Sequence, residues 1–309
     1  MAAILFLAPA DLGETVLATG ALAHAMRDGD ALTVVCTADA APLFRAAPGL
    51  AELRVIGAGL AQRWSGWMEL ARARFDLIID ARGGFLALPG TRRVALKPSS
   101  VLRHRAEDWA AAFDADRPLA PKLWLDARAR AAAAAIAPGA ALLVLAPGGA
   151  SEAKRWPRDR FAAVARRLVD GPLAGARVAV LAAADRDAAI TRAIVSSLDA
   201  DGVAAADLGE GLDLLAAAAL MERATLCIGN DNALTHIAAA MGAPTLTLFG
   251  PTDERVRAPY RPRARALRGR SLEQIAAMST LDEGRAMEDV GIDAVEAAAL
   301  DLLHAGGLR

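Results

Sequence analysis

The sequence predicts an α/β protein with two domains, each built on a parallel sheet. The chain has 309 residues, which is too long for a single ordinary hydrophobic core. Short apolar runs of strand length alternate along it with stretches of helical apolar spacing, as in repeated βα units. Residues 224–249 read as a complete strand, helix and strand with polar residues at the strand ends. Open α/β sheets bind ligands at that edge, so the loops that follow the strands are candidate binding sites.

The first half of the chain carries the first series of these elements. Strands are predicted at residues 3–8, 31–37, 52–56, 75–80 and 92–96, and helices at 15–27, 40–46, 64–74 and 109–113. Residues 114–125 are irregular and contain prolines, and residues 127–137 form an Ala/Arg helix of low complexity. Composition changes over residues 118–138, where a new βα series starts. We therefore place an N-terminal domain at residues 1–137 and a C-terminal domain at residues 138–309.

The second half repeats the pattern. Strands are predicted at residues 141–146, 177–182, 203–208, 224–228 and 244–249, and helices at 157–168, 185–198, 213–223, 233–241, 272–278 and 293–304. Pro157 suits the first position of its helix, where a backbone N–H is not needed. Residues 261–270 read as a basic connector.

Composition excludes several classes of protein. The net charge is −1 and the basic residues are scattered, which argues against a nucleic-acid partner. No apolar run reaches the roughly 20 residues that span a bilayer, and the first residues lack the basic start of a signal peptide. Cys36 and Cys227 lie in apolar runs without metal-ligand spacing, as buried thiols of a reducing compartment would. We expect a cytoplasmic protein.

The loop after the first strand carries two carboxylates, Asp11 and Glu14, on either side of Gly13. Its glycines do not form the G-x-G-x-x-G fingerprint of dinucleotide-binding folds, so NAD is not expected. Glu14 can be read as an acid that favours the helix dipole from the first turn. It can also be read as a carboxylate bordering a crevice at the strand end.

The loop at residues 147–157 has the composition of a phosphate site. Gly148 and Gly149 let backbone N–H groups approach a ligand, and Lys154 and Arg155 supply positive charge. The loop is not a P-loop, because the terminal Gly-Lys-Ser/Thr is missing.

A polar turn, Asn230, Asp231 and Asn232, joins a strand to the helix at residues 233–241. Asn and Asp side chains accept hydrogen bonds from first-turn N–H groups, so these residues can be plain helix caps with His236 against the core. Alternatively, Asp231 and His236 border the same strand-end crevice, five residues apart.

A basic run lies between residues 92 and 105, where Arg92, Arg93, Lys97, Arg103, His104 and Arg105 occur without an acid among them. Such a run is commonly a solvated face. The alternative is a patch that receives an anionic substrate or a membrane surface with acidic lipids.

Three separated motifs together resemble the lipopolysaccharide heptosyltransferase family, glycosyltransferase family 9. Residues 12–22, L-G-E-T-V-L-A-T-G-A-L, are similar to the family's L-G-D-x-(V/L)-L-x-T-x-A-L. Residues 147–161, from P-G-G-A-S through K-R-W-P to F, are similar to its P-G-A-S…K-R-W-P…F. Residues 229–236, G-N-D-N-A-L-T-H, and 250–253, G-P-T-D, are similar to its G-N-D-(S/T)-G-x-x-H…G-P-T-D, and M-E-D-V at 287–290 with Val295 also fits.

The resemblance implies a GT-B fold, in which two Rossmann-like domains face each other across a cleft. The N-terminal domain would hold the acceptor and the C-terminal domain the nucleotide-sugar donor, and we expect the final helix to pack back on the N-terminal domain. The implied reaction is inverting and metal-independent, with no cofactor. It moves a heptose or related sugar from an ADP-sugar, ADP-heptose, to an anionic glycolipid of the lipopolysaccharide core, in peripheral contact with the cytoplasmic face of the inner membrane.

The resemblance also implies roles for individual residues. The catalytic base falls on Glu14, a role that Asp11 could share or take over, and Lys154 would stabilise the leaving diphosphate. The implied donor-binding residues are Gly148, Gly149, Ser151, Lys154, Asp185, Leu212, Asn230, Asp231, Asn232, Ala233 and His236. The implied acceptor-binding residues are Arg82, Arg92, Arg93, Lys97 and Arg103.

The chain departs from the family pattern at three positions. Glu14 replaces Asp, Ala233 replaces Gly, and Asn232 stands where a hydroxyl is common. Two alternatives therefore stay open: a GT-B transferase that uses another nucleotide sugar for a different envelope or exopolysaccharide acceptor, and a catalytically silent protein that binds a nucleotide sugar.

Overall fold

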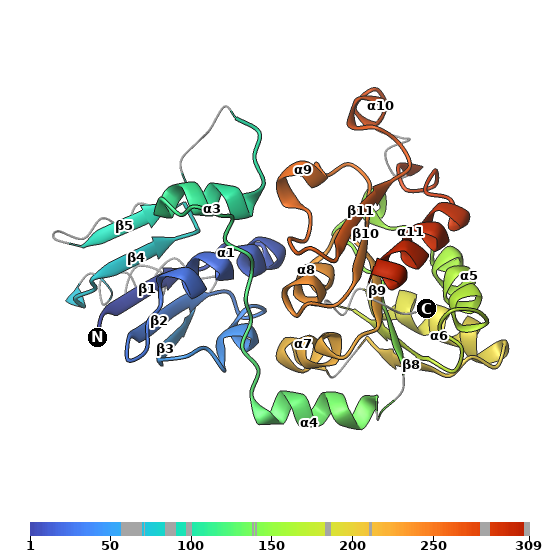
Figure 1. The fold of residues 1–309 in the computed structure, drawn as a ribbon, viewed down its shortest axis with the longest axis horizontal. Helices are drawn as coiled ribbons and strands as arrows, with labels where there is room; N and C mark the ends of the chain where they lie inside the picture. The colour runs from blue at the N-terminus through green and yellow to red at the C-terminus, as the bar shows by residue number, and fades with distance from the viewer. Residues whose placement is uncertain are drawn as a thin grey trace. The chain divides into compact units, whose positions relative to one another are not determined.

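The computed structural model describes residues 1–56, 70, 72–83, 91–96, 101–137, 139, 141–182, 187–209, 212–278 and 285–305. The chain divides into two compact units, Met1–Asp126 and Ala127–Arg309, called here the first and the second unit. Each has parallel strands with helices packed on them (Figure 1), so the predicted α/β class is confirmed.

The first unit is built on five parallel strands in the order β3-β2-β1-β4-β5. Alternation along β1 sends Leu5 and Leu7 to one buried cluster and Phe6 to the other face, where its ring lies 5.6 Å from that of Phe44. The elements are β1 (Ala3–Leu7), α1 (Leu12–Ala25), β2 (Ala31–Cys36), η1 (Ala41–Phe44), β3 (Leu50–Val55), β4 (Leu77–Asp80), β5 (Arg92–Ala95) and α3 (Arg105–Phe113).

The second unit is built on six parallel strands in the order β11-β10-β9-β6-β7-β8. Its elements are α4 (Ala127–Ile136), β6 (Leu142–Ala146), η2 (Glu152–Lys154), α5 (Arg158–Val169), β7 (Arg177–Leu181), α6 (Ala188–Ala200), β8 (Ala205–Leu208), α7 (Leu214–Glu222), β9 (Leu226–Asn230), α8 (Ala233–Ala240), β10 (Thr245–Phe249), α9 (Glu254–Arg257), β11 (Ala264–Arg268), α10 (Leu272–Ala276) and α11 (Ile292–Ala305).

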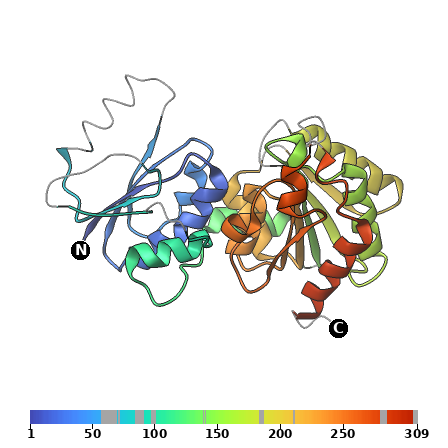
Figure 2. The ribbon, with the colours of Figure 1, turned by 90° about the horizontal axis from the view of Figure 1, so that it is seen from above.

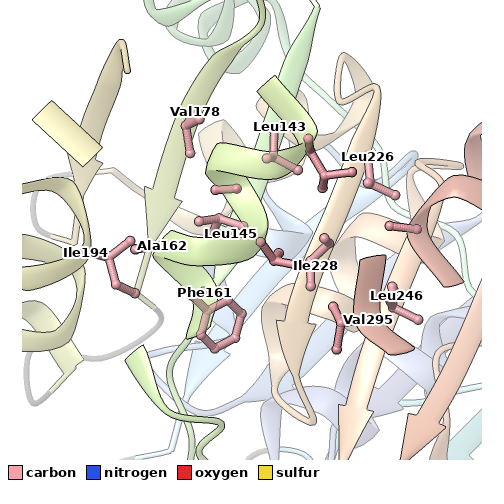
Figure 3. Close-up of a cluster of buried hydrophobic side chains, with 14 of the residues drawn as sticks. Leu143, Leu145, Phe161, Ala162, Val178, Ile194, Leu226, Ile228, Leu246 and Val295 are labelled. Carbon is pink, nitrogen blue, oxygen red and sulfur yellow. The ribbon is translucent and has the colours of Figure 1, made fainter. Parts of the chain in front are cut away.

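Helices cover both faces of the second sheet (Figures 1 and 2). On one face, alternate strand residues such as Leu145 and Ile228 meet Phe161 of α5 and Val295 of α11 in a continuous apolar cluster (Figure 3). α7 and α8 lie on the other face (Figure 1). Because the central strands are buried from both sides, they read as unbroken apolar runs, which explains why the sequence indicated them clearly.

In both sheets the strand order reverses between two central neighbours, β1 and β4 in the first unit and β6 and β9 in the second. This is the arrangement of Rossmann-like sheets, whose ligands bind beyond the carboxyl ends of the strands at the reversal. The loops that begin with Ala8 and Pro147 and the turns after Asp80 and Asn230 therefore lie at the expected binding edges.

The strands agree closely with the sequence predictions. Every strand predicted among the described residues is present, with bounds within two residues of the prediction. The predicted helix at residues 64–74 falls largely outside the described residues. Residues 261–270 are more than a connector, because they contain the parallel edge strand β11. Pro157 is the N-cap of α5 rather than its first helical residue.

The division of the chain into two units also differs from expectation. The compact units divide after Asp126 instead of after residue 137. Helix α4 belongs to the second unit because it packs on α7, with an ion pair between Arg130 and Glu222. Helix α11 packs within the second unit, where Val295, Leu302 and Leu303 complete the core, and its expected packing on the first unit stays a prediction.

Candidate functional site

Three loops of the second unit converge at the carboxyl ends of its strands. The first follows β6 and contains Gly148 and Lys154, the second is the turn from β9 into α8, and the third follows β10. Their contact is close: a Cβ added to Gly250 of the third loop would lie 2.5 Å from the carbonyl oxygen of Ala153 in the first. The two motifs of the second unit that the sequence suggested, at residues 147–161 and at 229–236 with 250–253, are thus brought together in space.

The turn after β9 separates the capping residue from the charged one. Asn232 is the N-cap of α8, and its side-chain oxygen accepts hydrogen bonds from the N–H groups of Leu234 (2.9 Å) and Thr235 (3.3 Å). Asp231 does not cap the helix. Its carboxylate instead forms an ion pair with the Lys154 ammonium at 2.8 Å, between side chains that are 9% and 24% exposed. The plain-cap interpretation therefore holds for Asn232 and not for Asp231.

His236 borders the same carboxylate from the first turns of α8. Its Nε2 lies 3.9 Å from the second carboxylate oxygen of Asp231, and its side chain is 5% exposed. That separation exceeds hydrogen-bond length. Asp231 therefore lies between a lysine in contact and a histidine just out of contact.

Two asparagine amides connect this turn to the loop after β6. Asn230 donates to the carbonyl oxygens of Pro147 (2.6 Å) and Gly148 (3.4 Å), and its own oxygen accepts from the N–H of Trp156 (3.1 Å). Asn232 donates to the carbonyl oxygens of Ala146 and Gly148, both at 2.9 Å. The backbone of the loop is therefore held at its start and at its end.

The same loop presents backbone donors that are not used internally. Among the described residues, none accepts a hydrogen bond from the N–H groups of Gly148, Gly149, Ala150 or Ser151. Gly148 and Gly149 are buried, and Ala150 and Ser151 are exposed. Buried N–H groups in proteins are nearly always paired, so a run of unpaired ones next to a lysine is typical of an anion site.

The glycines of the loop are required by close contacts. A Cβ on Gly148 would lie 2.5 Å from a carboxylate oxygen of Asp187, and one on Gly149 would lie 3.0 Å from Cγ of Arg155. Asp187 is itself paired with Arg155 at 2.7 Å. This pair therefore packs against the loop at Gly148.

The remaining predicted donor residues are placed as follows. Ala233 begins α8, and Leu212 is partly buried immediately before Asp213, the N-cap of α7. Asp185 lies outside the described residues, as does Lys97 of the predicted acceptor set.

The third loop is organised by an arginine from β11. Arg268 donates to the carbonyl oxygens of Thr252 (2.7 Å) and Gly250 (3.1 Å) and pairs with Glu254. Asp253 caps α9, and its hydrogen bonds with the Arg255 side chain hold the pKa of its carboxyl below the usual value. The loop next to Ala153 is thereby fixed.

In the first unit, Asp11 and Glu14 have different partners. Asp11 is the N-cap of α1 and accepts from the N–H of Glu14 at 2.9 Å. The Glu14 carboxylate pairs with Nε of Arg105 at 3.2 Å, and Arg105 also pairs with Asp108 at 3.1 Å. Glu14 is thus more than a first-turn acid, since its side chain meets a cation from the start of α3.

The basic run is divided between structural and exposed residues. Arg93 pairs at 2.5 Å with Asp80, whose fully buried side chain also accepts from the N–H groups of Arg82 and Gly83. Arg92 and Arg103 are exposed. The acceptor roles of these arginines stay a prediction.

Other chemistry has little support among the described residues. No three His, Cys, Asp or Glu side chains of the described ranges are grouped so as to hold a metal ion. None of the described helices has the length and apolar run that a bilayer crossing requires. Cys36 and Cys227 are free and buried, as predicted, and burial raises the pKa of Cys36 to about 11 and that of Cys227 to about 12.

Comparison with known proteins identifies the family. Residues 80–283, about two thirds of the chain, match the sequence model of glycosyltransferase family 9 (heptosyltransferase). The chain belongs to glycosyltransferase family 9. Lipopolysaccharide heptosyltransferase 2 of Escherichia coli K12 is 30% identical over 117 residues, which cover 38% of this chain and 32% of that protein. The matched segment thus spans about a third of the length of this relative.

Solved structures show the fold of this family 9 chain. ADP-heptose heptosyltransferase II of E. coli matches with a TM-score of 0.77 and 20% identity, covering 98% of this chain and 99% of that one. E. coli heptosyltransferase WaaC with ADP matches with a TM-score of 0.71 and 16% identity, over 97% and 99%. The iron-containing glycosyltransferase TibC of enterotoxigenic E. coli, at a TM-score of 0.58 and 14% identity, covers 100% and 80%. The expected GT-B fold is therefore confirmed.

The structure of this family 9 member adds residues that the sequence interpretation missed. Arg105 was seen only as part of a basic run, yet it pairs with Glu14, 91 positions away. Asp187 and Arg268, which support the first and third loops, were not singled out. Their signal in the sequence is weak, because each partner lies on another element and only the sheet order brings the two together.

Proposed function

We propose that this chain is an inverting, metal-independent glycosyltransferase that moves a heptose or related sugar from ADP-heptose to a glycolipid of the lipopolysaccharide core. The observation that carries the proposal is the unpaired run of N–H groups from Gly148 to Ser151 beside Lys154, at the strand-order reversal of the second unit. Such a site suits a diphosphate that must be stabilised as it leaves. Family membership supports the choice of donor, as do two structural relatives, one described as an ADP-heptose heptosyltransferase and one with ADP bound.

The donor diphosphate would receive hydrogen bonds from the loop N–H groups and the charge of Lys154. Because Lys154 is paired with Asp231 in the unliganded protein, the diphosphate must compete with that carboxylate. Asp231 would then bind hydroxyls of the donor sugar instead of lying beside the phosphates. His236, 3.9 Å from Asp231, would orient that carboxylate or donate to a phosphate.

The chemical step is a single displacement with inversion. The acceptor hydroxyl oxygen attacks the anomeric carbon of the donor, its proton passes to the Glu14 carboxylate, and the bond to the nucleoside diphosphate breaks on the opposite face. General-base assistance of this kind contributes roughly 10²–10⁴-fold. The Glu14 carboxylate pairs with Arg105 at 3.2 Å, and an incoming acceptor hydroxyl can displace this partly exposed contact.

The acceptor would be an anionic glycolipid met at the cytoplasmic face of the inner membrane. Exposed Arg92 and Arg103, with Arg82, supply the positive charge for it in the first unit. Arg93 is less suited to this role, since it already neutralises the buried Asp80.

Calorimetric titration with ADP, UDP, GDP and NAD in EDTA tests the proposal. We expect metal-free binding of ADP that Lys154→Ala loses together with transfer, while the unfolding midpoint stays near that of the parent. Arg158→Ala is the matched control, because it removes a 59% exposed cation a few residues away. An active Lys154→Ala variant would contradict the role of Lys154, and a requirement for iron or another metal would contradict metal independence.

The nucleotide preference separates the alternatives. Preference for UDP or GDP would keep the transferase and replace the heptose by another sugar. Donor binding without turnover, tested with extracts that supply many acceptors, would favour a catalytically silent protein that binds nucleotide sugars.

A further inference from the structure

The side-chain amide of Asn232 has no hydrogen-bonding capacity left for a ligand. An Asn amide offers two N–H donors and two acceptor lone pairs. Both donors are used by the carbonyl oxygens of Ala146 and Gly148, and both lone pairs by the N–H groups of Leu234 and Thr235. A substrate could bind this amide only by displacing an internal partner.

Asn230 makes a parallel set of contacts from a fully buried position. Its two donors reach the carbonyl oxygens of Pro147 and Gly148, and its oxygen accepts from the N–H of Trp156. The two amides therefore converge on the Gly148 carbonyl oxygen. Three successive carbonyl groups, those of Ala146, Pro147 and Gly148, are directed at asparagine side chains.

This arrangement fixes the direction of the loop donors. In a trans peptide the C=O of one residue and the N–H of the next lie in one plane and point in opposite directions. No peptide bond in the described chain is cis. Holding the Pro147 oxygen on the asparagine side therefore turns the Gly148 N–H to the other side, and holding the Gly148 oxygen does the same for the Gly149 N–H.

We propose that Asn232, together with Asn230, is a positioning residue that aims the N–H groups of Gly148 and Gly149 at the donor diphosphate and touches no substrate atom. The inference rests on the proposed function for the identity of the ligand. It replaces the direct donor contact that the sequence implied for both asparagines. The site is thereby arranged before the ligand arrives, which is how fixed donors stabilise developing charge effectively.

Among residues that cap helices well, only asparagine can both cap α8 and donate two hydrogen bonds to the loop after β6. Ser, Thr and Asp cap helices equally well, because capping needs only an acceptor oxygen. None of them supplies two N–H donors. Asn232→Ser therefore keeps the cap of α8 and removes both contacts with the loop. Asn232→Asp keeps the shape and the cap but places a carboxylate oxygen against two carbonyl oxygens.

The first experiment measures amide hydrogen exchange of residues 148–156 in the unliganded protein. We expect severalfold faster exchange at Lys154, Arg155 and Trp156 in Asn232→Ser and in Asn232→Asp, while α8 stays protected because its cap remains. Asp213→Ala, which removes the N-cap of α7, is the matched control and should leave the loop unchanged. Parent-like exchange of the loop in both Asn232 variants would overturn the inference, whatever the ligand is.

The second experiment compares ADP with adenosine by calorimetry. Asn232→Ser should weaken ADP binding roughly tenfold and leave adenosine binding unchanged, because only the phosphates meet the loop donors. Equal weakening of both ligands would indicate a general structural defect and contradict the positioning role. If the parent protein bound no nucleoside diphosphate, the proposed function would fail, and the exchange experiment would still decide the role of Asn232.

Discussion

The two units place their candidate residues at the same point of similar sheets but hold them by different interactions. In the second unit, buried amides and backbone groups fix the loop after β6, and Asn230 is completely buried. In the first unit, Glu14 is held by an ion pair whose side chains are 16% and 30% exposed. Partly exposed ion pairs are weak and exchange readily, whereas buried hydrogen-bond networks are rigid. The candidate site of the second unit is thus the more rigid of the two, as a proposed diphosphate site requires, whereas Glu14 in the first unit can exchange its partner when the proposed acceptor binds.

The largest expected effect comes from Glu14, the proposed base in the first unit. Glu14→Gln should lower kcat by roughly 10²–10⁴-fold and leave ADP affinity unchanged, because it removes the proton acceptor and nothing from the donor loops. Radiolabelled sugar transfer at saturating substrates measures it. Asp11→Asn is the matched control, since Asn retains the cap of α1 and lacks the carboxylate. A comparable loss in Asp11→Asn would show that Asp11 shares the base role.

The sequence could predict local features of the fold and the site, but not contacts between residues far apart in the chain. The cap at Asn232 and the strands of the second sheet could be predicted, because caps and apolar runs are local sequence patterns. Two ion pairs could not be predicted, because only the fold brings their partners together. They are Lys154 with Asp231, 77 positions apart, and Arg105 with Glu14, 91 positions apart. The domain boundary was misplaced because α4 has only small alanines, Ala129 and Ala133, on its buried side, and therefore shows no apolar stripe.

A second test concerns the contact between the first and third loops of the second unit. Gly250→Ala should weaken ADP binding by roughly tenfold, because its Cβ would lie 2.5 Å from the Ala153 carbonyl oxygen and shift the neighbouring Lys154. Gly291→Ala is the matched control: a Cβ there meets nothing within 4 Å. Calorimetry on both variants gives the comparison. Parent-like affinity for ADP in Gly250→Ala would mean that the loop after β10 can shift to accommodate the added methyl group without moving Lys154.

A smaller effect, of opposite sign, is expected at the ion pair between Lys154 and Asp231 in the second unit. Asp231→Asn should tighten ADP binding by a few-fold, because it removes the carboxylate that competes for Lys154, and should slow transfer, because the donor sugar loses its hydroxyl acceptor. The gain in affinity should shrink as salt is raised. Weaker ADP binding by Asp231→Asn would instead mean that the pair is needed to hold Lys154 in position.

The smallest expected effect is on acceptor binding, and it distinguishes the roles of two neighbouring arginines of β5. Arg92→Glu should raise the acceptor KM by only a few-fold, since an exposed cation contributes little in water. Arg93→Gln should instead lower the free energy of unfolding by roughly 1–3 kcal/mol, because it takes a partner from the buried Asp80 carboxylate. Denaturant melts and acceptor titrations on both variants measure the difference. An unchanged KM in Arg92→Glu would return this part of the basic run to a solvated face, and would leave acceptor recognition to residues nearer Glu14.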